Sequence, residues 1–534
     1  MSAQDTNRHP RLCAGLILTG LVGAAYAQPP SAPSPVSIRP ATMPRIGTVD
    51  ERFQSVNIEM VEVTGGRFWK PYGKEVDALL KAPPSAGPVG MDPALYQQRP
   101  PIDLANSRLR KLAAALGPAY VRVSGTWANT TWFQNSDDAA PANPPTGFNG
   151  VLTRRQWKGV VDFSRAVDAR IVASFATSAG TRDAAGVWTP AQARQFLAYT
   201  KSIGGSIAAA EYMNEPTFAE IGGAPKGYDA AAYARDIAVF RPFVKQAAPD
   251  MVILGPGSVG EGVSLVPAGM AKGQLKTEDL LAATGPVFDA FSYHFYGAIS
   301  KRCASMAPVS GTTAADALSE EWLSRTGRVE AFYAGLRDKF EPGKPLWVTE
   351  TADAGCGGNP WGSTFLDSFR YLDQLGRLAR SGVQVVAHNT LASSDYGLLD
   401  ENTLTPRPNY WSALLWRGLM GPAVLDPGPS PAPGLHLYAH CLRGHPGGVA
   451  LLAINTGRDA SQSLELPTDS DRYTLTARNL EDTRVQLNGN ELKLGDDDEL
   501  PRLAGVRTPS GRVTFAPASI TFLAIPNANN GSCR

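Results

Sequence analysis

Between residues 50 and 420, short apolar runs alternate with segments whose apolar residues recur every three or four positions. The runs have the length of strands, and the recurring spacing is that of helices with one buried face. Continuous apolar strands that alternate with amphipathic helices are typical of a parallel sheet covered by helices. The predicted strands are FQSVNIEM (53–60), AYVRVSG (119–125), RIVASFA (170–176), SIAAAEYM (206–213), MVILGPG (251–257), FDAFSYHFY (288–296), PLWVTET (345–351) and VQVVAHNT (383–390).

Eight such units predict an α/β protein with a (β/α)8 TIM barrel, over residues 48–420. A doubly wound open sheet is the alternative, but no G-x-G-x-x-G follows the first strand. After residue 420 the pattern changes to short alternating runs separated by Gly, Pro, Asn and Asp, such as LHLYAHCL and RYTLTARNL. This pattern is typical of an antiparallel β-sandwich, which we expect over residues 421–534.

The N-terminus has the features of an export signal. A basic segment precedes the short apolar run LCAGLILTGLVGAA, and Ala25-Tyr26-Ala27 offers a cleavage site. The apolar run is shorter than the ~20 residues of a membrane span. We therefore expect a signal peptide at 1–27, a secreted or periplasmic protein, and a Pro/Ser-rich linker at 28–47 that does not pack.

Charge and cysteine content narrow the function classes. The formal net charge is +1, so no global basic field indicates nucleic acid or an anionic membrane as a partner. The chain beyond the signal peptide contains four cysteines, at 303, 356, 441 and 533, which allow three disulfide pairings. No C-x-x-C motif or His/Cys cluster indicates a metal, and we expect neither a metal nor a cofactor. His436 and His440 are interpreted as strand-surface residues.

Active sites of (β/α)8 barrels form at the carboxyl ends of the strands. The fourth predicted strand ends at Asn214-Glu215 and the seventh at Glu350, which places two glutamates nearly opposite each other across the barrel mouth. Hydrolysis of a glycosidic bond requires such a pair of carboxylates, and their separation decides between retention and inversion. Glu211 lies within the fourth strand, and we expect it to be a structural ion-pair partner.

Several further stretches are informative in their order and spacing: SRLRKLAAALGPAYVRVSGT, YMNEPTF, WVTETADAGCGG, GVQVVAHNTLASSDYGLLDENTLTPRPNYWSALLWRGLMG and RVQLNGNELKL. They resemble glycoside hydrolase family 79, the heparanase and β-glucuronidase family. The resemblance implies that Glu215 is the general acid/base, that Glu350 is the nucleophile of a retaining mechanism, and that Asn214 contacts the sugar 2-hydroxyl. Hydrogen bonds from Tyr296 or His294 would keep the nucleophile ionised.

The resemblance also implies where a uronate is bound. Similar proteins use backbone N–H groups of a Gly-rich turn after the nucleophile and a tyrosine after strand eight, and glycines let a main chain approach an anion closely. Glu59 and Thr126 match further positions that contact the sugar. Two departures stand out: heparanases carry Asp at the position of Glu59, and a cysteine lies in the turn. The expected uronate-binding residues are Cys356, Gly357, Gly358 and Tyr396.

We also hypothesise two disulfides among the four cysteines. Cys303–Cys356 would join the loops after strands six and seven, and Cys441–Cys533 would tie the C-terminal tail to the sandwich, as in similar family members. The family further implies that residues before strand one join the sandwich. We also expect a single-chain monomer.

The implied substrate is a glycan that contains β-linked glucuronic acid, either heparan sulfate or a plant or microbial glucuronide. Exo action is favoured over endo action because dense basic runs are absent and insertions at 61–100 and 127–150 would wall in a pocket. The alternatives are a secreted polysaccharide-binding protein without activity and a clan relative that acts on neutral sugars, such as a β-xylosidase. Intact Glu215 and Glu350 argue against the first, and the Gly-Gly turn with Tyr396 argues against the second.

Overall fold

The computed structural model describes residues 36–81, 92–263, 273–304 and 312–534. The expected signal peptide and the first part of the expected linker, up to residue 35, lie outside these ranges. Among the described helices, none is long and apolar enough to cross a bilayer.

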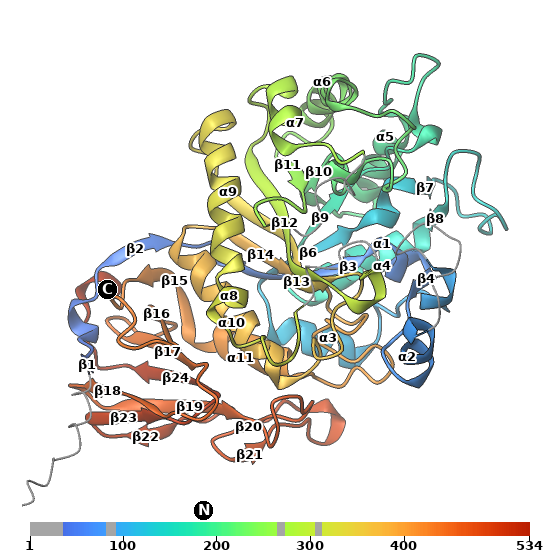
Figure 1. Cartoon of the computed structure of the whole chain (residues 1–534). Helices are drawn as coiled ribbons and strands as arrows, with labels where there is room; N and C mark the ends of the chain where they lie inside the picture. Colours follow the sequence, from blue (N-terminus) through green and yellow to red (C-terminus); the bar gives the residue numbers. More distant parts are fainter. Residues whose placement is uncertain (1–35, 82–91, 264–272, 305–311) are drawn as a thin grey trace, which may run out of the picture. The chain divides into compact units, whose positions relative to one another are not determined.

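The predicted strands close into one parallel barrel, whose ring order is β10-β11-β12-β13-β14-β3-β6-β9 (Figure 1). All eight predicted strands are present, and their ends shift by only a few residues. Neighbours in the ring are neighbours along the chain, as expected for successive right-handed βαβ units. The strands are β3 (Gln54–Glu59), β6 (Ala119–Ser124), β9 (Ala169–Ser174), β10 (Ile207–Glu211), β11 (Val252–Ser258), β12 (Ala290–Ile299), β13 (Leu346–Gly355) and β14 (Val385–His388).

The barrel interior is layered, because alternate residues of each strand point inward. The layer at the amino ends of the strands is an apolar cluster that includes Tyr120, Leu254 and Trp347. Two residues further along the strands, Arg122 and Glu211 form a buried ion pair. The carboxyl ends carry the remaining acidic groups. An apolar floor therefore separates the charged layers from the bottom of the barrel.

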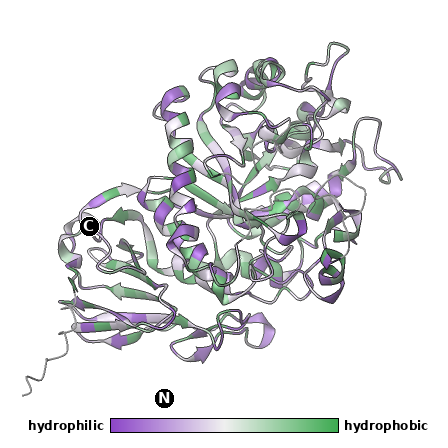
Figure 2. Ribbon diagram, viewed as in Figure 1, coloured by the Kyte–Doolittle hydropathy of each residue, from purple (hydrophilic) through white to green (hydrophobic). Residues whose placement is uncertain are grey.

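Helices surround the strands and bury their apolar faces against them (Figure 1), and hydrophobic residues gather on the barrel strands (Figure 2). Helix α4 begins with a capping box between Thr153 and Gln156, which satisfies two free backbone N–H groups. The helices are α1 (Met60–Thr64), α2 (Lys74–Lys81), α3 (Ser107–Ala115), α4 (Arg154–Ala166), α5 (Ala191–Ser202), α6 (Ala230–Ala247), α7 (Thr277–Thr284), α8 (Glu320–Leu323), α9 (Arg325–Phe340), α10 (Phe365–Arg380) and α11 (Pro408–Leu419).

The expected insertions at 61–100 and 127–150 contain small strand pairs and short helices at the carboxyl side of the barrel. Their described strands are β4 (Gly66–Trp69) with β5 (Tyr96–Arg99), and β7 (Thr131–Gln134) with β8 (Gly150–Thr153). Short 3₁₀ helices lie at the strand ends that matter below, namely η3 (Thr126–Thr130), η5 (Pro216–Phe218) and η6 (Lys301–Cys303).

The C-terminal part is a β-sandwich, as predicted. Within the described residues a nine-stranded sheet packs on a three-stranded sheet of order β1-β18-β23. The smaller sheet contains β1 (Val36–Ser37), β18 (Gln462–Leu466) and β23 (Gly511–Phe515). The larger contains β2 (Arg45–Thr48), β15 (Met420–Leu425), β16 (Leu435–Leu442), β17 (Val449–Asn455), β19 (Ser470–Thr476), β20 (Gln486–Leu487), β21 (Asn490–Glu491), β22 (Val506–Thr508) and β24 (Ser519–Ile525).

The central strands of the larger sheet are buried on both faces. In β17, Leu451 packs in the sandwich core, whereas its neighbour Leu452 packs in the core that the sheet shares with the barrel helices. A strand covered on both faces reads as a continuous apolar run rather than an alternating one. This explains why GVALLAINTG lacks the alternation of its neighbours in sequence.

The linker prediction is wrong for residues 36–47. Strand β1 pairs with β18, and β2 pairs with β15, so this segment belongs to the sandwich. Two of its large apolar residues, Ile38 and Met43, are buried in the sandwich core, whereas Val36 and Ile46 are exposed. The side chain of Asn530 donates hydrogen bonds to the carbonyls of Pro40 and Met43. Two well-placed apolar residues and backbone pairing suffice to order a segment whose composition alone is typical of a linker.

A cluster of charges joins the barrel to the sandwich. We call Asp373 and Arg377 of α10, Glu320 of α8, and His436 and Tyr438 of β16 the junction cluster. Asp373 is buried and accepts hydrogen bonds from Tyr438 at 2.5 Å and from Nε of Arg377 at 2.6 Å, and it lies 2.5 Å from Nδ1 of His436. The prediction that His436 and His440 are strand-surface residues is therefore wrong, because the side chain of His436 is only 11% exposed and His440 is buried.

Both hypothesised disulfides are present in the structure. Cys303–Cys356 joins η6, after strand β12, to the turn after strand β13. Cys441–Cys533 joins β16 to the C-terminal tail.

Candidate active site

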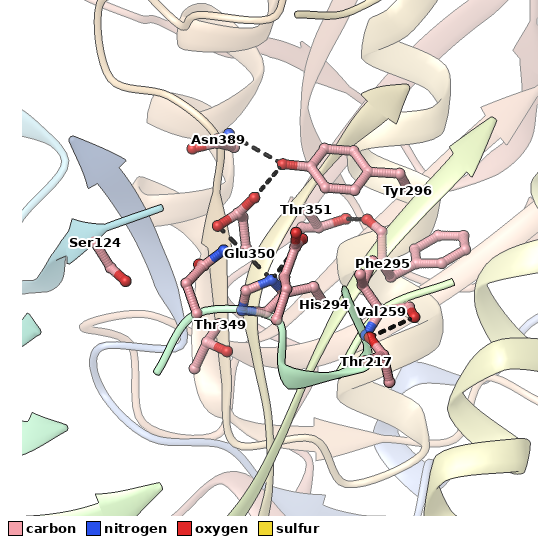
Figure 3. A network of polar contacts seen from close by, with 12 residues as sticks. Ser124, Thr217, Val259, His294, Phe295, Tyr296, Thr349, Glu350, Thr351 and Asn389 are labelled. Carbon is pink, nitrogen blue, oxygen red and sulfur yellow. Dashed lines mark hydrogen bonds and ion pairs between the residues drawn. The ribbon is translucent and has the colours of Figure 1, made fainter. Parts of the chain in front are cut away.

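The turn after strand β10 positions Glu215. The carboxamide of Asn129 in η3 bonds both backbone groups of Asn214, at 2.8 and 3.0 Å. Glu215 has a left-handed backbone conformation (φ 49°), and Pro216 begins the short helix η5 directly after it. The hydroxyl of Thr217 donates a hydrogen bond to the carbonyl of Val259 and accepts one from its backbone N–H, as Figure 3 shows. The Asn-Glu-Pro sequence lies just beyond the end of β10 and fixes the direction of the glutamate.

Strand β13 carries Glu350, whose carboxylate is held from two sides. Tyr296 donates a hydrogen bond to Oε1 at 2.5 Å, and Arg122 donates one to Oε2 at 2.8 Å. Figure 3 shows the chain of contacts from Asn389 through Tyr296 to Glu350. His294 of β12 lies between the two glutamates, with Nδ1 3.1 Å from Glu215 and 3.7 Å from Glu350.

The two glutamates are close together. Glu215, His294 and Glu350 each have a ligand atom within 4.8 Å of those of the other two. Retaining glycosidases have carboxyl groups about 5–5.5 Å apart and inverting ones about 6.5–9.5 Å apart, so the geometry fits retention. These three residues are also the described group that could hold a metal by distance. The guanidinium of Arg122, 2.8 Å from Glu350, disfavours a metal ion there.

The surroundings of the two glutamates separate their protonation states. Burial raises the pKa of Glu215, and the negative charge of Glu350 raises it further. Burial acts in the same direction on Glu350, but His294, Arg122 and the hydrogen bond from Tyr296 together lower its pKa. One carboxyl group thus keeps its proton while its neighbour stays ionised, as an acid and a nucleophile require.

His294 is the second cation of this site. Burial opposes a charge on the ring, yet Glu350 and the contacts with Glu211 and Glu215 raise the pKa of His294 to about 9. Nη2 of Arg122 lies 3.1 Å from Nε2 of His294, a contact that a charged ring repels. The surrounding carboxylates nevertheless favour the charged form.

Glu59, Asn389 and the tyrosines form the other wall of the site. The carboxamide nitrogen of Asn389 contacts the carboxylate of Glu59 at 3.0 Å, and the hydroxyls of Tyr296 and Tyr396 at 3.0 and 3.2 Å. Burial and the charge of Glu350 raise the pKa of Glu59 well above its usual value. The carboxyl group of Glu59 lies over Gly125, where a Cβ would meet Oε2 at 1.5 Å. The Ser-Gly-Thr sequence thus leaves room for this acid.

The Gly-rich turn is held from behind by Arg302. Cys356, Gly357 and Gly358 all have positive φ angles, and Nη1 of Arg302 donates to their three carbonyl oxygens at 3.0–3.3 Å. Arg302 also pairs with Asp395, next to Tyr396. Because the carbonyls of the turn point to Arg302, their negative ends do not face a bound anion.

The structure gathers most of the expected site residues. Asn214, Glu215, His294, Tyr296 and Glu350 contact one another directly or through Arg122. Glu59 and Tyr396 join them through Asn389, and a Cβ at Gly358 would lie 3.2 Å from the Tyr396 ring. Thr126 begins η3 directly after Gly125, and no contact of its side chain joins it to the described cluster. Cys356 takes part in a disulfide, so only its backbone is available to a ligand.

Sequence reasoning missed three residues of the site. Arg122 interrupts the apolar strand AYVRVSG, and a buried arginine in such a strand needs a carboxylate partner, which was a usable signal. Asn389 follows the eighth strand directly, where a barrel places its site residues. Arg302 lies in a polar loop segment with no pattern that separates it from a solvent-exposed arginine.

The sequence profile of Glycosyl hydrolase family 79, N-terminal domain, matches residues 100–376, just over half of the chain. The chain belongs to glycosyl hydrolase family 79.

Two sequence relatives and one solved structure show what this family member is similar to. The chain is 26% identical over 486 residues to Heparanase-like protein 1 of Arabidopsis thaliana, covering 81% of this chain and 86% of the relative. It is 31% identical over 233 residues to Baicalin-beta-D-glucuronidase of Scutellaria baicalensis, covering 40% and 44%. The fold is similar to that of a 4-O-alpha-L-rhamnosyl-beta-D-glucuronidase from Fusarium oxysporum, with a TM-score of 0.60 and 13% identity over 92% of this chain and 100% of the other. The family 79 member described here is thus a glycoside hydrolase.

Proposed function

We propose that the protein is a retaining β-glucuronidase. The observation that carries the proposal is the pair of Glu215 and Glu350, one with a raised and one with a lowered pKa, at the mouth of the barrel. The names of the relatives, a heparanase-like protein and a β-D-glucuronidase, support glucuronic acid as the sugar.

The reaction proceeds in two steps. Glu215 protonates the glycosidic oxygen while ionised Glu350 attacks the anomeric carbon, and the leaving group departs with the proton. Glu215, now a carboxylate, then removes a proton from water, which releases the sugar from Glu350 with retained configuration. Asn214 is placed to bond the 2-hydroxyl, because Arg122 holds its carboxamide oxygen at 2.8 Å and so fixes its orientation.

The uronate carboxylate is proposed to lie against the turn of Gly357 and Gly358, near Tyr396. Within the described chain, the amides of both glycines donate to no protein acceptor. Arg302 behind the turn adds a positive charge, which Asp395 offsets in part. A neutral sugar would leave this arrangement unused, which favours a glucuronide over a xyloside or glucoside.

Exo action is the finer proposal. The chain has a net charge of only +1, and a sulfated polymer that threads through an open groove would be better served by a basic surface. Endo action on a glycosaminoglycan is the second candidate, favoured by the likeness to a heparanase-like protein over most of the chain. We also propose that the enzyme is exported, on the basis of the signal-like N-terminus.

The test compares hydrolysis of an aryl β-glucuronide, an aryl β-glucoside and heparan sulfate by the wild type and by Glu350→Gln. Of the two aryl glycosides we expect hydrolysis of the glucuronide alone, and we expect loss of turnover in the variant. Size analysis of heparan sulfate products separates exo from endo action, because endo cleavage shortens the polymer early. Activity on the glucoside without activity on the glucuronide would refute the uronate proposal, and unchanged turnover of Glu350→Gln would refute the mechanism.

A further inference from the structure

Glu211 is fully buried in the barrel interior, and its hydrogen bonds and ion pairs are all with residues of the barrel strands. Its side chain has 0% exposure. Oε1 accepts hydrogen bonds from Ser292 at 2.8 Å and Thr349 at 2.6 Å, and Oε2 accepts from Nε and Nη2 of Arg122 at 3.1 and 2.9 Å. A Cβ at Gly257 would lie 2.9 Å from Oε1. Glu211 therefore connects β10 with strands β6, β11, β12 and β13.

These contacts determine how Arg122 is oriented. Glu211 engages one edge of the planar guanidinium, formed by Nε and Nη2, and this leaves Nη1 directed at Glu350. Nη2 also donates to the carboxamide oxygen of Asn214 at 2.8 Å. A guanidinium is a rigid fork, so fixing one edge fixes the direction of the other donors. One buried carboxylate thus directs the contacts of both the nucleophile and the residue proposed to bond the 2-hydroxyl.

Glu211 also balances charge. Arg122 and His294 are cations that both face Glu350, and Glu211 faces both of them, with Oε2 3.8 Å from Nε2 of His294. Without Glu211, the cations Arg122 and His294 would both act on Glu350, and the layer of the barrel that contains Arg122 would hold no ionised carboxylate to offset them. The titratable and charged groups that interact with this cluster are Arg122, His294, Glu350, Glu215, Glu59, Tyr296, Tyr396 and, from helix α6, Tyr233.

We propose that Glu211 is a positioning residue for the hydrolysis. It holds Arg122 in the orientation that serves Glu350 and Asn214, and it offsets one of the two cations beside the nucleophile. It does so without contact with substrate, since Arg122 and the barrel strands enclose it. The inference rests on the proposed function for its catalytic meaning, whereas its electrostatic part concerns the free protein alone.

The charge role has a signature that a packing role lacks. Removing one negative charge from a coupled cluster makes every remaining group lose its proton at lower pH. In Glu211→Gln, which keeps the shape of the side chain, both limbs of the pH profile of kcat/KM move to lower pH. His294 also titrates at lower pH. We expect kcat/KM at the wild-type optimum to fall about 100-fold, because the geometry around Glu350 relaxes.

Two variants separate charge from packing. Glu211→Asp keeps the charge but shortens the reach to Arg122, so kcat falls about tenfold while both limbs stay near their wild-type positions. Thr349→Val removes a hydrogen bond to the same oxygen of Glu211 and leaves its charge, so it also keeps the limbs in place. Thermal unfolding of each variant shows whether it is folded. Should Glu211→Gln not fold, Glu211→Asp decides: shifted limbs or a wild-type kcat would overturn the proposal.

The decisive measurement is an NMR titration of ¹⁵N-labelled histidine in the wild type, Glu211→Gln and Thr349→Val, beside the pH profiles with an aryl β-glucuronide. The chain has only six histidines, so the signal of His294 is assignable by mutation. An unchanged His294 titration together with unshifted limbs in Glu211→Gln would overturn the proposal. A wild type without activity on any glucuronide would refute the proposed function instead, and the titration, which needs no substrate, would still decide the electrostatic role of Glu211.

Discussion

The active-site cluster and the junction cluster are built from the same types of residue. In each, a buried carboxylate accepts from an arginine and a tyrosine and lies beside a histidine: Glu350 in the first and Asp373 in the second. In both cases the pKa of the carboxyl group is lowered and that of the histidine is raised. The contacts of one carboxylate alone would not tell the two regions apart.

The difference lies in the number of acids around each pair of cations. At the junction, Asp373 and Glu320 face Arg377 and His436, so charges balance. In the active site, Arg122 and His294 face four acids, which are Glu59, Glu211, Glu215 and Glu350. Two of these carboxyl groups must hold protons, because four buried negative charges near two positive ones repel each other. The excess of acids turns a structural ion-pair network into one that exchanges protons.

Loss of the proton donor should have the largest effect. In Glu215→Gln, kcat for a glucuronide with a poor leaving group should fall about 10³-fold, because general acid catalysis contributes about 10²–10⁴. A phenol of low pKa leaves without protonation, so with such a substrate the first step should be largely restored. Steady-state and burst kinetics with a series of aryl glucuronides measure this. Equal losses across the series would contradict the acid role of Glu215.

The same kind of change at the junction should affect stability instead. Asp373→Asn leaves Arg377 and His436 without their buried partner, so the free energy of unfolding should fall by about 3–5 kcal/mol. Because the hydrogen bonds and ion pairs of Asp373 are with junction residues and not with active-site residues, kcat of the folded variant should stay within about twofold of the wild type. Denaturant unfolding and kinetics below the unfolding transition test both parts. A large loss of kcat without loss of stability would contradict the structural role of the junction cluster.

Removing one hydroxyl from the active site should give a smaller effect. Tyr296→Phe deletes the 2.5 Å hydrogen bond to Glu350, which raises the pKa of that carboxyl group. The acid limb of the kcat/KM profile should therefore move to higher pH, and kcat/KM should fall about tenfold, or ~1.4 kcal/mol. Tyr438→Phe is the matched change at the junction, where we expect a lower Tm and an unmoved pH profile. A fixed acid limb in Tyr296→Phe would count against the role of this hydroxyl.

The smallest predicted effect is a pH dependence of stability. Burial opposes a charge on His436, but Asp373 raises its pKa above the ordinary 6.5 in the folded state. A histidine with a raised folded-state pKa stabilises fully below the unfolded-state value, and this stabilisation is lost as pH rises through the folded-state value. The unfolding free energy of the wild type should thus decline above neutral pH more steeply than that of His436→Gln. Parallel curves would exclude His436 as the responsible group.

The barrel was predictable because its strands are buried on both faces. A run such as RIVASFA has one interpretation once helical periodicity follows it, and the strand ends then locate Glu215 and Glu350. The N-terminal segment of the β-sandwich was harder to predict. Residues 36–47 have the composition of a linker, and their order depends on pairing with strands more than 370 residues away, which no local pattern records.

The candidate site was predictable where residues lie near the carboxyl ends of the predicted strands. Asn214, His294 and Tyr296 were found this way. Arg122 was missed, and so was Asn389 although it directly follows the eighth strand, because their importance comes from which side chains they contact across the barrel. Nothing in the sequence order brings Asn389 to Glu59, or Arg122 to Glu211. Arg302 was missed for the same reason, since its partners are the backbone carbonyls of a turn in another loop.

The pairing of β1 and β2 with the sandwich has a consequence for synthesis of the protein. The first described strands find their partners, β18 and β15, only after the ribosome has made the whole barrel. Until then their backbone groups remain open to other chains, as at any unpaired strand edge. The sandwich can thus close only as the last part of the molecule. A polypeptide that stops before residue 462 would keep its barrel sequence and lose the partner of its first strand.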